Sequence, residues 1–116
     1  IGPIHSTRNA RAWAVLTPSG SGYVLEDSEN VTLSSSNTDT IFLDWTNPPP
    51  NVSDVCCVMG HQNVTDPGNN VVVITDINSD DQGAIIHAWE LDLANGTVSD
   101  GVNGGNVELA AYWNEE

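Results

Sequence analysis

The amino-acid sequence predicts an all-β fold, an antiparallel β-sandwich of about seven or eight strands with almost no helix. Three observations support this fold class. Short apolar runs recur along the 116 residues, clusters of Gly, Pro, Asn and Ser separate them, and no segment sustains a capped 3.6-residue apolar repeat. We expect one sandwich domain over residues 12–116, preceded by residues 1–11 as an N-terminal extension or anchoring arm.

The first half of the chain contains five candidate strands, of which the last two are the more strongly apolar. They span residues 13–16, 22–25, 31–33, 40–45 and 55–59. Turn-forming residues separate them, including a run of three prolines at 48–50. Cys56 and Cys57 are adjacent on the fifth candidate, where alternation places them on opposite faces and predicts no disulfide between them.

The second half contains three candidate strands, at residues 71–75, 84–93 and 107–113. In the segment 84–93, alternation places Trp89 on one face and Glu90 on the other, with apolar residues on both faces. Such two-sided apolar character favours burial against a second subunit. The glycine-rich link at 100–106 predicts that the last two strands form a hairpin.

The charge balance excludes several classes of partner. The chain has 16 acidic residues, no lysine and only two arginines, Arg8 and Arg11, which gives a net charge of −14. Lys and Arg supply the phosphate contacts that dominate nucleic-acid affinity, and an acidic surface repels anionic lipid headgroups. No apolar run approaches the roughly 18 residues of a membrane span. We therefore expect neither nucleic-acid binding nor membrane insertion.

No catalytic constellation emerges from the sequence. His5, His61 and His87 are scattered and do not lie at metal-ligand spacing from another histidine or a cysteine. A cysteine nucleophile with a histidine base is one combination to consider, formed by Cys56 or Cys57 with His61. However, the sequence shows no third residue that would orient the base. The sequence therefore predicts that the protein is not an enzyme.

An acidic segment before the penultimate candidate strand resembles the start of a calcium loop. The alternating oxygen-bearing residues there, with one more acidic neighbour, are the candidate calcium ligands Asp76, Asn78, Asp80 and Asp81. Asp81 stands where a calcium loop has its turning glycine, and His87 stands where it has its bidentate glutamate. Calcium is thus a candidate cofactor, and an acidic hairpin turn is the alternative.

Four tryptophans in so small a domain suggest carbohydrate binding. Sugar sites combine an aromatic ring that stacks on the sugar with short polar groups that bind hydroxyls. Trp45 and Trp89, which lie near polar loops, are the candidate rings, and Asp100, Asn103 and Asn106 are the candidate polar groups. The alternative is that tryptophans at strand positions belong to the core or to a subunit interface.

The order of motifs over residues 9–60 resembles the C-terminal module of bacteriophage tail-fibre proteins. Asn-Ala-Arg-Ala-Trp at 9–13 precedes an Asn-Val strand at 30–33, a strand and proline segment at 40–50, and a strand ending in Gly60. This resemblance implies a trimeric β-sandwich at a fibre tip that contacts glycans of the host surface.

The second half is also similar to the H-type lectins, which are small trimeric β-sandwiches that bind N-acetylgalactosamine. Trp89 in the penultimate strand and Trp113 near the end match the aromatic positions of that family. Glu90 after the first tryptophan, and the absence of an arginine from residues 71–73, depart from the family pattern. Only Trp89 is carried over from this resemblance.

We therefore expect a virion appendage protein, a phage tail-fibre or receptor-binding domain at the virion surface or otherwise extracellular. The expected partners are copies of itself in a homotrimer, other virion proteins and a host surface polysaccharide. One alternative is a capsid decoration or fibre-joint protein without a ligand. Another is a secreted lectin of the H type, which predicts N-linked glycans at the sequon residues Asn30 and Asn63.

Overall fold

The computed structural model describes residues 9–62, 71–100 and 106–114, and within them it contains nine β-strands, one short 3-10 helix and no α-helix. The strands are β1 (Ala12–Ser19), β2 (Gly22–Glu29), β3 (Val31–Ser36), β4 (Thr40–Trp45), β5 (Cys56–Gln62), β6 (Val71–Ser79), β7 (Gly83–Asp92), β8 (Thr97–Asp100) and β9 (Asn106–Tyr112). The 3-10 helix η2 (Val52–Asp54) lies between β4 and β5. The predicted all-β fold is confirmed, and each of the eight candidate strands coincides with an observed one.

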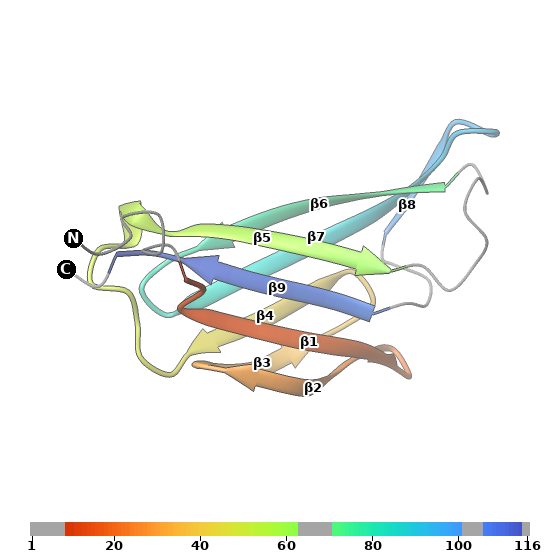
Figure 1. Ribbon diagram of the computed structural model, residues 1–116. Helices are drawn as coiled ribbons and strands as arrows, with labels where there is room; N and C mark the ends of the chain where they lie inside the picture. Colours follow the sequence, from red (N-terminus) through yellow and green to blue (C-terminus); the bar gives the residue numbers. More distant parts are fainter. Residues whose placement is uncertain (1–8, 63–70, 101–105, 115–116) are drawn as a thin grey trace.

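The strands form two antiparallel sheets that pack face to face (Figure 1). Sheet A has the order β2-β1-β9-β5. Sheet B has the order β3-β4-β7-β6, and β8 pairs with the far half of β7. Strand β7 is long enough to pair with β4 up to His87 and with β8 from Trp89 onward.

The predicted hairpin between the last two candidate strands is wrong. Strand β7 belongs to sheet B, whereas β9 lies in sheet A between β1 and β5. The hairpin partner of β7 is β8, which the sequence analysis missed. The turn between them is closed by Asp92, whose backbone oxygen accepts from the amide of Gly96 at 2.8 Å, and Gly96 adopts a left-handed φ of 68°.

The core lies between the inner faces of the two sheets. Its buried side chains are Ala12, Ala14, Leu16, Tyr23, Val31, Ile41, Leu43, Trp45, Ala84, Ile86, Val107, Leu109, Ala111 and Trp113. The two largest, Trp45 of sheet B and Trp113 after β9, meet edge to face with ring centroids 5.3 Å apart. Such a T-shaped pair contributes packing beyond the apolar area that it buries.

Two residues have backbone positions that restrict the side chain, one at the crossing between the sheets and one inside sheet B. Asn30 adopts a left-handed φ of 60° at the crossing from β2 in sheet A to β3 in sheet B, a conformation that asparagine tolerates better than most residues. Gly83 opens β7 so close to β4 that a Cβ there would overlap the Leu43 carbonyl oxygen. Close approach of two backbones is a recurring reason for glycine inside a strand.

The ends of the sandwich differ. At one end, the Arg11 amide donates to the Ala111 oxygen at 2.8 Å and its Nε donates to the Trp113 oxygen at 3.0 Å, which ties the start of β1 to the end of β9. At the other end, β8 and the adjoining parts of β6 and β7 reach beyond the strands of sheet A (Figure 1). Residues 1–8 of the expected arm lie outside the described residues. Among those described, no helix is both long and apolar enough to cross a membrane.

Candidate functional site

The two tryptophans predicted to contact sugar lie in different environments. Trp89 is half-buried on the outer face of β7, where its ring lies 4.3 Å from that of His87, centroid to centroid. Trp45 is only 6% exposed, and its Nε1 donates to the Asp80 backbone oxygen at 3.0 Å. The prediction of an accessible Trp45 ring is wrong, because alternation along β4 turns this side chain into the core.

The predicted polar ligands are not brought to one place. Asp100 ends β8 and lies opposite Trp89 in the backbone register of sheet B. Asn103 lies outside the described residues. Asn106 begins β9 in sheet A, so the structure separates it from Trp89 by placing the two residues in different sheets.

The four candidate calcium ligands do not converge. Asp76 and Asn78 lie on the edge strand β6, and Asp80 and Asp81 lie in the turn that joins β6 to β7. One oxygen of Asp80 accepts from the amides of Gln82 and Gly83 at 2.8 and 3.0 Å, which closes this turn. Among the described residues, no three His, Cys, Asp or Glu side chains are grouped closely enough to hold a metal ion. The geometry is that of the alternative, an acidic hairpin turn, and does not fit a calcium loop.

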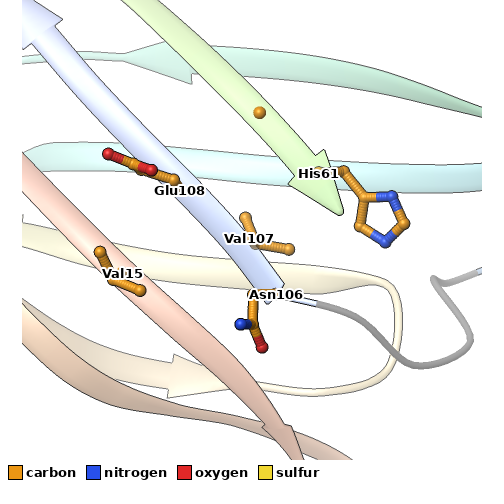
Figure 2. Close-up of a pocket in the computed structure, with 6 residues that line it drawn as sticks. Val15, His61, Asn106, Val107 and Glu108 are labelled. Carbon is orange, nitrogen blue, oxygen red and sulfur yellow. The ribbon is translucent and has the colours of Figure 1, made fainter. Parts of the chain in front are cut away.

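A hollow of about 320 Å³ opens over sheet A where β1, β9 and β5 run side by side (Figure 2). It is lined by Val15, Gly60, His61, Asn106, Val107 and Glu108. The register explains the hollow, because Glu108 lies between Val15 on one neighbouring strand and Gly60 on the other. A Cβ placed on Gly60 would meet no atom within 4 Å, so the glycine leaves open space beside the glutamate.

The polar groups at this hollow are available to a ligand. Glu108 and Asn106 are both exposed, and neither side chain makes a hydrogen bond or ion pair within the described part of the chain. The carboxylate accepts hydrogen bonds, whereas the amide both donates and accepts them. Val15 is half-buried and adds an apolar surface beside them. This combination can bind hydroxyl groups of a small ligand while its carbon skeleton contacts the valine.

The described residues show no pairing of an activated cysteine with His61. Burial raises the pKa of the Cys57 thiol, which is the opposite of what an activated nucleophile needs. Cys56 is exposed, and both thiols are free. Within the described residues, the buried Nε2 of His61 has no hydrogen-bond partner, so no cysteine is paired with it.

Of the residues that line this hollow, only Asn106 was predicted from the sequence as a ligand-binding residue. A further signal in the sequence is Gly60, which stands in an otherwise apolar candidate strand. Glycine inside a strand often marks a position where another backbone or a ligand approaches closely. Glu108 could not be selected from the sequence, since it is one of 16 acidic residues.

A second polar group lies on the outer face of sheet B. The Nδ1 atom of His87 lies 3.1 Å from the Thr40 hydroxyl, and its Nε2 lies 3.9 Å from an Asp39 carboxylate oxygen. Asp76 is the cross-strand neighbour of His87 on the other side. These residues and Trp89 sit on an open sheet surface, outside the hollow over sheet A.

The comparisons with known proteins give no family for this chain. Neither a protein-family model, nor a curated protein, nor a solved structure matches it.

Proposed function

We propose that this chain is a non-enzymatic module of a virion appendage, a phage tail-fibre or receptor-binding domain, that contacts glycans of the host surface through the hollow over sheet A. The observation that carries the proposal is the placement of Glu108 and Asn106 beside the space left by Gly60, with neither side chain hydrogen-bonded to another described residue. Polar groups with unused hydrogen-bonding capacity around a small concavity are typical of ligand sites.

The acidic surface supports a neutral or amine-bearing glycan as the ligand. Arg11 is the one cationic side chain, Lys or Arg, among the described residues, and its Nε is bonded to the Trp113 backbone. An anionic sugar would meet repulsion from a chain of net charge −14, and it would find no cation at the hollow to pair with. The proposal therefore excludes sialylated and sulfated glycans.

Assembly with copies of itself and with other virion proteins belongs to the same proposal. A module of this kind is held in its particle by protein contacts, and the tail-fibre resemblance implies three copies. The virion surface is the location that fits a domain whose charge favours solubility and repels nucleic acid.

The test is a glycan array with bacterial polysaccharides, followed by calorimetric titration of the neutral glycan that gives a signal. Glu108→Gln should weaken that binding roughly tenfold or more, because a hydrogen bond to a charged group contributes about 1.5–3 kcal/mol. Gly60→Leu should abolish it by filling the hollow, and the open space around Gly60 allows this change without a clash at the Cβ position.

Val24→Leu is the matched control, since Val24 is an exposed residue of sheet A outside the hollow. It should leave the affinity unchanged. Silence of the array with and without calcium would reject the glycan proposal, as would equal binding by the wild type and Gly60→Leu.

A structural role without a ligand, as a capsid decoration or fibre-joint protein, is the second candidate. Exposed apolar side chains on the outer face of sheet B, such as Phe42 and Ile85, favour this role. Exposed apolar patches commonly mark sites of protein–protein contact. Mass spectrometry of the intact virion gives the copy number, and hundreds of copies together with a silent array would support decoration.

The secreted-lectin alternative finds less support. Both hydrogens of the Asn30 amide are used, since Nδ2 donates to the oxygens of Arg11 and Asn47 at 3.2 and 3.0 Å. An N-linked glycan replaces one of these hydrogens and would break one bond. Asn63 lies outside the described residues. Peptide mapping of protein secreted from eukaryotic cells should find Asn30 unmodified.

A further inference from the structure

The turn between β7 and β8 contains an asparagine followed by a glycine (Figure 1). The sequence has two such pairs, Asn95-Gly96 and Asn103-Gly104, and the structure describes the first of them. Asparagine before glycine is the pair in which the side chain reacts most readily with the next backbone amide, because glycine has no Cβ to hinder the approach. Asn95 and Gly96 are both exposed, so water reaches this reactive pair.

The reaction available to the pair is a cyclisation followed by hydrolysis. The backbone nitrogen of Gly96 attacks Cγ of Asn95, and the new C–N bond closes a succinimide ring. The bond from Cγ to Nδ2 breaks, and Nδ2 leaves as ammonia together with the proton that the Gly96 nitrogen gives up. Water then opens the ring at either carbonyl, which gives aspartate or isoaspartate. Water is thus the one co-reactant that the conversion needs.

Asp92 holds both of the groups that must react. Its backbone oxygen accepts from the Gly96 amide at 2.8 Å, which engages the attacking nitrogen. Its Oδ2 accepts from Asn95 Nδ2 at 2.8 Å, which engages the leaving group. Its Oδ1 accepts from the amides of Ala94 and Asn95 at 3.0 and 3.3 Å, which fixes the backbone of the turn. Loss of the Gly96 amide proton and departure of Nδ2 each require one of these bonds to break.

The negative charge of Asp92 adds to this restraint. The side-chain amide of Asn95, and then its backbone amide, donate to the carboxylate and lower the pKa of Asp92 below its ordinary value. The carboxyl group is therefore ionised at neutral pH, where it accepts these bonds. Removal of the Gly96 amide proton leaves a negative charge on the nitrogen, and a nearby carboxylate opposes that charge.

Strand β8 is short enough to open locally. It has four residues, which pair with the far half of β7, and Thr97, Val98 and Ser99 are all exposed. Backbone pairs that bury few side chains open at a low free energy. Opening of the turn frees the Gly96 nitrogen and the Asn95 side chain together, so the opened form is the one that reacts.

We propose that Asn95 is a site of spontaneous deamidation, that Asp92 restrains the reaction while the turn is closed, and that the product prevents the turn from closing again. In the product, a carboxylate replaces the Nδ2 donor and faces Asp92, so attraction becomes repulsion. Isoaspartate also adds a methylene group to the backbone of the turn. The conversion therefore releases β8 from β7 in one direction only, and it is independent of the hollow over sheet A, which neither residue lines.

Peptide mapping by mass spectrometry after prolonged storage of the full chain at mildly alkaline pH tests the proposal. The map separates conversion at Asn95 from conversion at Asn103. In the folded wild type, Asn95 should convert about tenfold more slowly than in the chain unfolded by urea. Asp92→Asn should speed the conversion in the folded protein about threefold or more, because it removes the charge and one acceptor oxygen.

Asp80→Asn is the matched control, since Asp80 closes the β6–β7 turn with the same kind of bonds. It should leave the rate at Asn95 unchanged, and thermal melts show whether each variant is folded. Hydrogen exchange of the β8 amides should become faster in the converted fraction. Asn95→Gln, whose longer side chain would have to close a larger ring, should show no such change during the same storage.

Four outcomes would overturn the proposal. Two concern the restraint: equal rates at Asn95 in the folded and the unfolded wild type, or equal rates in Asp92→Asn and the wild type. The third is an acceleration by Asp80→Asn that matches the one by Asp92→Asn, which would trace the effect to general loosening of the fold. The fourth is unchanged exchange of the β8 amides after conversion, which would show that the product still closes the turn.

Discussion

The side chain of Asn30 closes a ring of hydrogen bonds with the backbone of Asn47: its Oδ1 accepts from the Asn47 amide at 2.7 Å and its Nδ2 donates to the Asn47 oxygen at 3.0 Å. The Asn30 backbone oxygen also accepts from the Thr46 amide. One residue thus fastens the β2–β3 crossing to the chain that leaves β4.

Replacing Asn30 with alanine should destabilise the fold by about 2–3 kcal/mol. The change removes three hydrogen bonds of the side chain and places a residue with a Cβ, but no compensating polar group, in a left-handed conformation. Urea unfolding followed by tryptophan fluorescence measures the loss. Asn51→Ala, which removes an exposed cap of η2, should cost about 1 kcal/mol or less, and an equal cost for both variants would contradict the role assigned to Asn30.

Among the described glycines, Gly83 is the one whose replacement by alanine should lower the free energy of unfolding most. The new Cβ would overlap the backbone of Leu43, which cannot move without separating β4 from β7. We expect a loss of about 3 kcal/mol or more, or failure to fold. Gly60→Ala, where the space is empty, should change the free energy of unfolding by less than about 1 kcal/mol. Similar urea midpoints for the two variants would show that the contact at Gly83 is not as close as described.

The two packed tryptophans should respond differently to replacement by phenylalanine. Trp45 donates its Nε1 hydrogen to Asp80, whereas the buried Nε1 of Trp113 has no partner among the described residues. Both changes remove similar volume from the core, but only Trp45→Phe breaks a hydrogen bond. It should therefore cost about 1 kcal/mol more than Trp113→Phe, measured by chemical denaturation. A larger loss of stability for Trp113→Phe than for Trp45→Phe would show that the hydrogen bond from Trp45 to Asp80 does not stabilise the fold.

Acid should destabilise the protein in part through Asp80. The amides of Gln82 and then Gly83, which donate to its carboxylate, lower its pKa below the ordinary value of 3.8. A carboxyl group whose pKa is lower in the folded state stabilises the fold above its unfolded pKa, and this contribution is lost as the pH falls through the folded pKa. Stability should thus decline below about pH 3.8 as Asp80 is protonated.

An NMR titration of the Asp80 carboxyl carbon checks the direction of the shift. Asp80→Asn should flatten the decline in urea midpoint in this range. Asp44→Asn, which changes a carboxylate without a hydrogen bond in the described part of the chain, is the control. A titration of Asp80 at or above 3.8 would contradict the closed turn.

The sequence was sufficient to locate strands that bury one face and insufficient where strands bury little. Alternation identified the β4 segment at its exact bounds because Ile41, Leu43 and Trp45 are all buried. It missed β8 and the second half of β2. In β2, the consecutive residues Glu26 and Asp27 are both exposed, so the edge strand continues there without apolar alternation. Edge strands are held by backbone pairing, which leaves little trace in hydropathy.

Pairing and site assembly were harder still. The glycine-rich link suggested that β7 and β9 were neighbours, but local turn chemistry does not reveal that the chain crosses between sheets. For the same reason Asn106 and Trp89 seemed to be one site, although they belong to different sheets. The hollow depends on which residues flank Glu108 on β1 and β5, a long-range relationship that a single sequence does not contain.

The bonds of Arg11 to Ala111 and Trp113 have a mechanical consequence. They hold the start of β1 beside the end of its antiparallel neighbour β9. Tension applied through residues 11 and 113 would therefore open the β1–β9 ladder from one end, so that its hydrogen bonds would break one after another rather than together. The sandwich should therefore resist tension in this direction less well than a load that slides β1 lengthwise along β9.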